Sequence, residues 1–188
     1  MHESPMKYVI YDTEWLLSQK AGGTRQKFVY FWGHRGRGDK VVTKACFSQW
    51  WSSPFEVDGN QYASAEHWMM AEKARLFGAE EIYAKILEAR SPGKAKAMGR
   101  QIENFDSVVW DAEKYDIVVR GNFHKFSQHA DLGQFLKDTG KRILVEASPV
   151  DKIWGVGLAQ DDPMIETPSK WRGQNLLGFV LMSVRNLI

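Results

Sequence analysis

The stretch SAEHWMMAEKA (64–74) constrains the fold most strongly, because it combines a helix cap with an amphipathic run. Ser64 is a good N-cap for a helix over about 65–77, and Gly78 can end that helix. The following segment, AEEIYAKILEA (79–89), has the periodicity of a second helix. We therefore expect consecutive helices in this part of the chain.

Two further cap signals extend the helical pattern. Ser91 before Pro92 puts a cap residue ahead of proline at the first helical position, which predicts a helix to about Ile102. Asp111 is a suitable cap for a longer helix that continues through about residue 128. Helices are therefore predicted to dominate the fold.

The remaining elements are predicted to be short. The pair Asp58-Gly59 lies between short apolar runs and is typical of a hairpin turn. These elements are a strand over 27–33, a hairpin over 55–62, a short helix over 132–140, a buried strand over 142–148 and an apolar final helix over 175–188. The predicted fold class is mainly α with a few short β-strands.

Size and charge restrict the function classes. The chain has 188 residues, enough for one domain with a real core and short for two. Its 25 basic and 23 acidic side chains give a net charge of +2, so tight nonspecific binding to a nucleic-acid backbone is not implied. A local basic pocket for one or two phosphates is compatible with this balance, and the loop HRGRGDK (34–40) can supply further local charge.

The expected location is the cytoplasm. Cys46 is the single cysteine, so an intramolecular disulfide is excluded and a reducing compartment is indicated. No stretch approaches the roughly 18 apolar residues that span a membrane, and the N-terminus shows no signal-peptide pattern. No Cys/His cluster has the spacing of a zinc site, and neither His124 nor His129 has a metal-type partner, so we expect no metal site.

The helix over 65–77 carries an acid and a base on one face. Glu66 and Lys73 share this face with methionines, and at about 1.5 Å of rise per residue they lie roughly 10 Å apart along the axis. That spacing suits a cavity that holds a sugar. It equally suits a helix in which Glu66 offsets the dipole and Lys73 extends from the core edge, and spacing alone favours this second interpretation.

A second candidate segment is VEASPVDKIWGVG (145–157). It presents Asp151 and Trp154 in a loop after a buried strand, where functional side chains are common. An acid beside a tryptophan can stabilise a cationic sugar-like centre stacked on the ring. The alternative is that Asp151 forms an Asx turn and Trp154 fills the core.

Two cations on predicted helices are candidate phosphate ligands. They are Arg100 and Lys125, and their head groups both suit phosphate. A solvated helix face is the simpler interpretation of each residue taken alone. The chain has no Walker A loop, no G-x-S-x-G and no G-x-G-x-x-G.

Seven motifs, taken in order, resemble the YbiA-like, or NADAR, family, whose domains are associated with NAD and ADP-ribose metabolism. The resemblance covers roughly residues 28–188 and implies a single compact YbiA-like domain, with residues 1–27 as a lead-in packed on it. The motifs are FW (31–32), FSQWWSSPFEVDG (47–59), YASAEHWMMAEKA (62–74), SPGKAKAMGR (91–100), KFSQH (125–129), TGKRILVEASPVDKIWGVGL (139–158) and WRGQNLLGFVLMSVR (171–185).

The resemblance implies an enzyme, because members of this family are N-glycosidases. They hydrolyse the C–N bond between ribose C1 and a nitrogen of a base-like group. One associated substrate class is the phosphorylated ribosylaminopyrimidine intermediates of riboflavin biosynthesis, and the other is ADP-ribose attached to guanine. We expect the first class, since the chain shows no strong basic stripe. The alternatives are an ADP-ribosylguanine hydrolase that acts on nucleic acid or nucleotide, and a non-catalytic nucleotide-binding module.

The family's motif glutamate and lysine fall on Glu66 and Lys73, and its loop acid and tryptophan fall on Asp151 and Trp154. A carboxylate at the anomeric carbon stabilises oxocarbenium character, a role open to Glu66 or Asp151. In a second route, Lys73 attacks C1 of a ring-opened imine and Glu66 moves protons. A methionine-lined setting is expected to lower the pKa of the Lys73 amine.

The remaining expected substrate contacts follow from the same resemblance. The family often has Asn-Phe where this chain has Gln49-Trp50, so an amide is kept but the fit of the base changes. No cofactor is expected, the partner is a small phosphoribosyl or ADP-ribosyl substrate, and the sequence leaves the oligomeric state open. The expected contacts are Trp32, Trp68 or Trp110 stacked on the base, Gln49 beside it, Trp154 on the sugar, Arg100 and Lys125 on the 5′-phosphate, and Asn175 at the start of the last helix.

Overall fold

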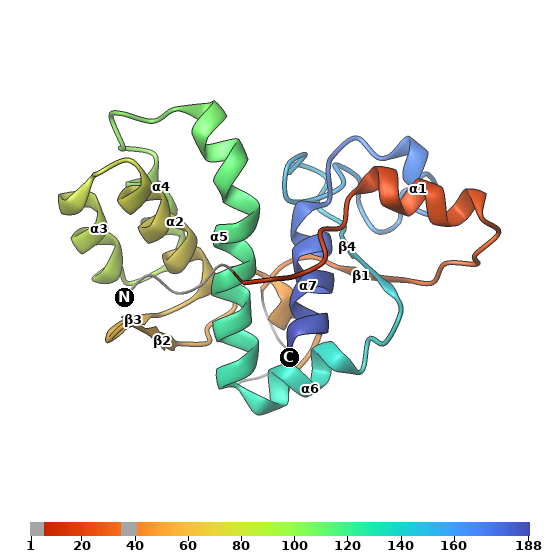
Figure 1. Ribbon diagram of the computed structural model, residues 1–188, viewed down its shortest axis with the longest axis horizontal. Coiled ribbons are helices and arrows are strands. Elements are labelled where there is room, and N and C mark those ends of the chain that lie inside the picture. The colour runs from red at the N-terminus through yellow and green to blue at the C-terminus, as the bar shows by residue number, and fades with distance from the viewer. Residues whose placement is uncertain (1–5, 35–40) are drawn as a thin grey trace. The chain divides into compact units, whose positions relative to one another are not determined.

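The computed structural model describes residues 6–34 and 41–188, and in them it contains seven α-helices and four short β-strands (Figure 1). The expected fold class, mainly helical with a few short strands, is confirmed. The chain divides into two compact units, Met1–Ser48 with Asp131–Ile188 and Gln49–Ala130. The predicted basic loop over 34–40 lies, apart from His34, outside the described residues. No helix among the described residues is long and apolar enough to cross a membrane.

The unit Gln49–Ala130 is a helical assembly built around one central helix. That helix, α2, packs against α3, α4 and α5, and the β2–β3 hairpin packs against α2, α3 and α5. The elements are β2 (Phe55–Val57), β3 (Asn60–Tyr62), α2 (Ala65–Leu76), α3 (Glu80–Leu87), α4 (Pro92–Gly99) and α5 (Ser107–Gln128). Nine of the twelve residues of α2 are buried, so this helix forms the core of the unit.

The cap signals explain where these elements start and stop. The Ser64 hydroxyl accepts a hydrogen bond from the His67 N–H, and Ser91 in the same way caps α4 ahead of Pro92. In the hairpin, Asp58 and Gly59 have φ of 50° and 76°, the left-handed pair that a two-residue turn of this kind requires. These predictions from local sequence are confirmed.

The predicted start of α5 at Asp111 is wrong. The helix begins five residues earlier, because the Asp106 side chain, on an extended backbone, accepts hydrogen bonds from the N–H groups of Val108 and Val109. Asp111 lies inside the helix instead, and its carboxylate pairs with the Lys114 ammonium at 2.6 Å.

The unit Met1–Ser48 with Asp131–Ile188 is organised by a parallel pair of strands. β1 and β4 pair in parallel with Phe28 opposite Ile143 and Phe31 opposite Glu146, and α7 packs on β4. The elements are α1 (Thr13–Ala21), β1 (Phe28–Phe31), the 3₁₀ turn η1 (Lys44–Phe47), α6 (Ala130–Lys137), β4 (Ile143–Glu146), the 3₁₀ turn η2 (Pro168–Lys170) and α7 (Leu176–Leu187).

Helix α1 was not anticipated. It lies in the segment that the sequence suggested to be a lead-in, and Asp12 caps it by accepting from the Trp15 N–H at 2.7 Å. The segment before it is joined to α7, since the Ser183 hydroxyl donates to the Val9 carbonyl. The proposed division of the chain between residues 27 and 28 stays a prediction.

Candidate active site

Helix α2 positions the two residues of the first candidate pair, in the unit Gln49–Ala130. Glu66 lies in the first turn of the helix and is only 2% exposed. Lys73 lies two turns further on, in the last part of the helix, and is partly exposed. The acid is therefore held in the core of the unit, whereas the amine reaches its edge.

The Lys73 amine lies among aromatic rings. Its Nζ donates to the Gly99 carbonyl at 3.2 Å, and it lies 4.1 Å from the centroid of the Phe105 ring and 5.6 Å from that of Trp110. Burial lowers the pKa of Lys73, and the nearby charge of Arg100 lowers this pKa further. The expected fall in this pKa is thus found, and such an amine is more readily available as a nucleophile.

Close packing of α4 on α2 creates this setting. A Cβ at Gly99 would overlap the Met70 side chain, so glycine lets the end of α4 approach the methionine face of α2 without displacing that side chain. The approach brings the Gly99 carbonyl within reach of the Lys73 amine. Arg100, the exposed C-cap residue of α4, follows directly.

Three of the expected site residues therefore meet in one place: Lys73, Arg100 and Trp110. Two cations and an aromatic ring at the edge of the unit form a setting that suits a phosphorylated, ring-containing ligand. Phe105 belongs to the same group, although the sequence analysis did not select it. The only local signal for it was an aromatic residue in the polar loop before α5.

Gln49 lies beside the start of α2. Its backbone carbonyl accepts from the Glu66 N–H at 3.0 Å, and its side chain is 6% exposed. The side-chain Oε1 accepts from Nδ2 of Asn122 on α5 at 2.8 Å. The sequence missed Asn122, although a polar residue on the apolar face of α5, one turn from Val118 and Phe126, is a signal that can identify it.

Trp68 and Lys125 are both part of the core of this unit. The Trp68 indole N–H donates to the Ile117 carbonyl at 2.8 Å, and the residue is 3% exposed. Lys125 is fully buried on α5, with Nζ 5.1 Å from the centroid of the Phe126 ring. For Trp68 the geometry favours a structural role. Base stacking by Trp68 and phosphate binding by Lys125 stay predictions.

The loop that carries Asp151 and Trp154 belongs to the other unit. Asp151 forms an Asx turn: its Oδ1 accepts from the N–H groups of Ile153 and Trp154, each at 2.8 Å. The same carboxylate thus holds the loop and fixes the backbone of Trp154, which is half-buried. This matches the structural alternative for Asp151, and a catalytic role for it stays a prediction.

Asn175 joins α7 to strand β4. Asn175 is fully buried, and its backbone is in the left-handed helical region, with φ of 55°. Its Oδ1 accepts from the Glu146 N–H, and its Nδ2 donates to the Leu144 carbonyl, both at 2.9 Å. The Leu176 and Leu177 N–H groups at the start of the helix donate to carbonyls of the 151–157 loop. Substrate binding by Asn175 stays a prediction, and its amide is occupied by backbone groups.

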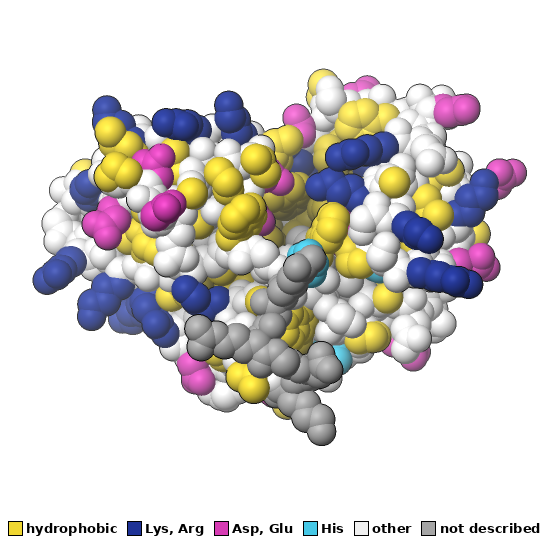
Figure 2. Space-filling model, turned by 180° about the vertical axis from the view of Figure 1, so that it is seen from behind, with side chains coloured by type: hydrophobic (Ala, Val, Ile, Leu, Met, Phe, Trp, Pro, Cys, Tyr) yellow, Lys and Arg dark blue, Asp and Glu magenta, His cyan; other side chains and the backbone are white. Residues whose placement is uncertain are grey.

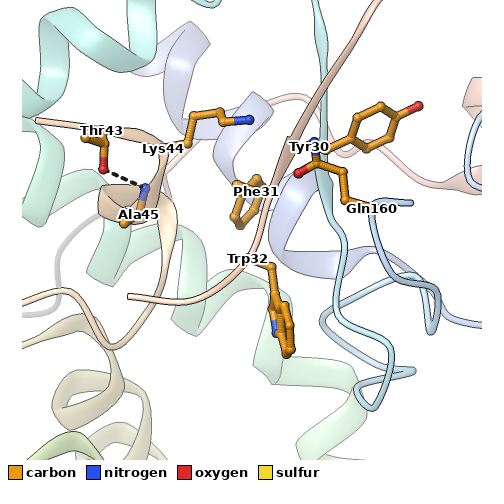
Figure 3. Close-up of a pocket in the computed structure, with 7 residues that line it drawn as sticks. All are labelled: Tyr30, Phe31, Trp32, Thr43, Lys44, Ala45 and Gln160. Atoms are coloured by element: carbon orange, nitrogen blue, oxygen red, sulfur yellow. Dashed lines mark hydrogen bonds between the residues drawn. The ribbon is translucent and has the colours of Figure 1, made fainter. Parts of the chain in front are cut away.

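Trp32 lines a cavity of about 240 Å³ in the same unit as Asp151 (Figure 3). The tryptophan follows β1, is 60% exposed, and shares the cavity wall with Phe31, Lys44 and Gln160. Figure 3 shows its indole projecting away from the Lys44 side chain, with Phe31 between them. An exposed ring and an ammonium group suit a planar ligand that carries a negative charge.

A metal centre is not evident in the part of the chain that the structure describes. No group of three or more His, Cys, Asp or Glu side chains there is arranged to hold a metal ion. His67 illustrates why: it is buried with its Nδ1 at 2.7 Å from the Ser64 hydroxyl and its Nε2 at 3.0 Å from the Ala89 carbonyl. Burial lowers the pKa of His67, so this imidazole is a core residue that holds the start of α2.

Comparison with solved structures places the fold in a known class. The fold matches the NMR structure of the Escherichia coli protein YbiA with a TM-score of 0.67, at 27% identity, over 87% of this chain and 86% of that chain. The fold is therefore that of a single YbiA-like domain.

Comparison with protein families matches residues 30–188 to the NADAR domain. The chain is 44% identical to N-glycosidase R617 of Acanthamoeba polyphaga mimivirus over 164 residues, 85% of this chain and 95% of the relative. It is 31% identical to N-glycosidase YbiA of Escherichia coli strain K12 over 139 residues, 74% of this chain and 78% of the relative. The chain belongs to the NADAR family, as its ordered motifs indicated.

Proposed function

We propose that this member of the NADAR family is an N-glycosidase that hydrolyses the bond between ribose C1 and the nitrogen of a phosphorylated ribosylaminopyrimidine, as formed in riboflavin biosynthesis. Relatives that match most of the chain are named N-glycosidases, which supports the reaction class. The observation that carries the proposal is the Lys73 amine, whose pKa is lowered among aromatic rings and beside a second cation.

The proposed reaction uses Lys73 as the nucleophile. A ribosylamine opens to an imine at C1, and the neutral Lys73 amine adds to that carbon. The C1–N bond to the pyrimidine then breaks, and the pyrimidine nitrogen leaves as an amine after taking a proton from Glu66. Water adds to the resulting Lys73 Schiff base, which releases ribose 5-phosphate and restores the lysine. If the sugar ring stays closed, the carboxylate of Glu66 stabilises the oxocarbenium character at C1.

The remaining roles follow from the same group of side chains. Arg100 is exposed next to Lys73 and is placed to hold the 5′-phosphate. Trp110 and Phe105 offer ring faces to the pyrimidine or its sugar. The family resemblance adds Asp151, a residue of the other unit, as a second carboxylate for the reaction.

A small-molecule substrate fits the charge of the chain better than a nucleic acid does. The net charge is +2, and on the face drawn in Figure 2 basic side chains occur beside acidic ones. One observation favours the second candidate, an ADP-ribosylguanine hydrolase. The cavity at Trp32 and Lys44, within the unit Met1–Ser48 with Asp131–Ile188, by itself offers a ring and a cation of the kind that a nucleotide needs.

Turnover with both substrate classes tests the proposal. The pure protein is incubated with a ribosylaminopyrimidine 5′-phosphate and, separately, with ADP-ribosylated guanosine, and products are followed by mass. Release of ribose 5-phosphate from the first supports the proposal, and cleavage of the second alone moves the chain to the second candidate. Turnover of neither by folded protein contradicts both and leaves a nucleotide-binding module.

Sodium borohydride separates the two routes to cleavage. Reduction during turnover is expected to fix the ribose on Lys73 as a stable adduct, which peptide mass mapping locates. Lys73→Ala abolishes that adduct, and Lys96→Ala, an alanine substitution of a lysine on the neighbouring helix, leaves it unchanged. Turnover without any adduct would assign Lys73 to substrate binding and the chemistry to the carboxylates.

A further inference from the structure

Two buried amides form a pair next to the start of α2. Asn122 Nδ2 donates to Gln49 Oε1 at 2.8 Å and to the Val118 carbonyl at 2.9 Å. Both acceptors are oxygens, so the nitrogen of Asn122 must face them and its Oδ1 must face elsewhere. Because Gln49 Oε1 receives this bond, the orientation of the Gln49 amide is fixed as well.

The pair leaves one donor and one acceptor over. Gln49 Nε2 and Asn122 Oδ1 are each buried, and neither finds a hydrogen-bond partner among residues 6–34 and 41–188. Gln49 is 6% exposed and Asn122 is fully buried. A buried polar atom without a partner costs about 1–3 kcal/mol, so two on one pair are unusual for a purely structural contact.

The pair is fixed to the candidate catalytic helix. The backbone carbonyl of Gln49 accepts a hydrogen bond from the Glu66 N–H at 3.0 Å. This bond fixes the residue that carries the side-chain amide to the backbone of the proposed acid. On the other side, Asn122 is held on α5 by its bond to Val118. Both anchors belong to the unit Gln49–Ala130, so the spare donor and acceptor keep their setting with respect to Glu66.

We propose that this amide pair recognises the lactam edge of the substrate's base: Gln49 Nε2 donates to the ring carbonyl and Asn122 Oδ1 accepts from the adjacent ring N–H. This inference rests on the proposed function and names the feature of the base that the site selects. A ligand edge with acceptors alone, such as a carboxylate, leaves Asn122 Oδ1 facing another oxygen. A pyrimidinone presents one carbonyl and one N–H side by side, and so does guanine, so the pair serves either substrate class.

The test compares a substrate with its O-methyl derivative. Methylation of the pyrimidinone oxygen removes the ring N–H and converts that nitrogen into an acceptor, which faces Asn122 Oδ1. We expect kcat/KM of the wild-type protein to fall about 100-fold on this change, the size expected when a site loses a buried hydrogen bond.

Substitutions in the pair are expected to remove this preference. Gln49→Met keeps the length of the side chain without the donor, and Asn122→Leu removes the acceptor at similar volume. Each should reduce the preference for the pyrimidinone to about tenfold or less, mostly through loss of kcat/KM on the pyrimidinone itself. Gln61→Met, on the exposed face of β3, is the control and keeps the full preference.

Two results overturn the inference: a wild-type protein that cleaves both compounds equally, or folded Gln49→Met that keeps the full preference. The second result would leave the pair as a structural contact while the proposed glycosidase stands. If the wild-type protein cleaves neither compound, calorimetric titration with diaminopyrimidinone and its O-methyl derivative decides. If the wild-type protein binds the pyrimidinone more tightly and Gln49→Met loses this preference, the amide pair is supported although the proposed function fails. If the wild-type protein binds both compounds equally, or binds neither, both proposals are rejected.

Discussion

At the scale of single residues, the account rests on the protonation of Lys73. A partly buried amine beside Arg100 is harder to protonate than a solvated one, and the rings of Phe105 and Trp110 replace part of its water shell. The Gly99 carbonyl holds the amine in place at 3.2 Å. These contacts turn an ordinary surface lysine into a candidate nucleophile.

Competitive acylation measures this directly. Lys73 should be modified at a lower pH in the folded protein than in the urea-unfolded chain, because only the neutral amine reacts and the pKa of Lys73 in the fold lies below its ordinary value of 10.5. Peptide mass mapping with trace acetic anhydride across pH 6–11 gives the titration curve of Lys73 in each state. Coincident curves for the two states would contradict the lowered pKa.

The same shift has a consequence for stability. Between the lowered pKa and 10.5 the unfolded chain binds more protons at this position than the folded chain, so the free energy of unfolding rises with pH. Lys73→Met removes the group. The free energy of unfolding of Lys73→Met, relative to that of the wild type, is therefore highest near neutral pH and falls as the pH approaches 10.5. Urea denaturation of both proteins at several pH values checks this.

At the scale of elements, two helix contacts depend on glycine. Gly99 admits Met70 where α4 meets α2, and Gly121 admits the Trp68 ring where α5 meets α2. The second contact also sets the position of Asn122, the next residue on α5. Helix packing therefore fixes the geometry of the site as much as the site residues do.

A pair of glycine substitutions tests this packing. Gly121→Ala places a methyl group into the Trp68 ring and should lower the free energy of unfolding by about 1–3 kcal/mol. Gly93→Ala on α4 is the control, since its Cβ would meet Trp50 only at 3.5 Å, and it should be neutral or stabilise by about 0.5–1 kcal/mol. Urea denaturation measures both, and equal effects would contradict the packing argument.

Local sequence was sufficient to predict most elements of this fold, because caps and turns act within a few residues. Ser64, Ser91 and the Asp58-Gly59 pair each bond to, or bend, their own neighbourhood, and the structure confirms them. Asp106 and Asp111 show the limit, because both are acceptable caps in sequence and the chain uses the first. The parallel pairing of β1 with β4 joins residues more than a hundred positions apart and had no local signal.

At the scale of the whole molecule, the family was evident from the order of the motifs, whereas the contacts of the site were not. Glu66 and Lys73 stand in one motif, but Phe105 meets Lys73, and Asn122 meets Gln49, only through the packing of distant segments. Conversely, Asn175 and Trp68 are expected ligand contacts whose polar groups bond to the backbone in the fold, and their contact with the substrate stays a prediction. Motif order identifies a family, and only three-dimensional packing separates site residues from residues that hold the site.

The most direct test of the account is the rate at which Glu66→Gln releases ribose 5-phosphate from a ribosylaminopyrimidine 5′-phosphate. The substitution keeps the shape of the side chain and removes the acid, so we expect a fall in kcat of about 10²–10⁴-fold relative to wild type. The thermal unfolding midpoint of the variant shows whether it is folded at the assay temperature. A folded Glu66→Gln protein with the wild-type rate would contradict the proposal that α2 carries the catalytic acid.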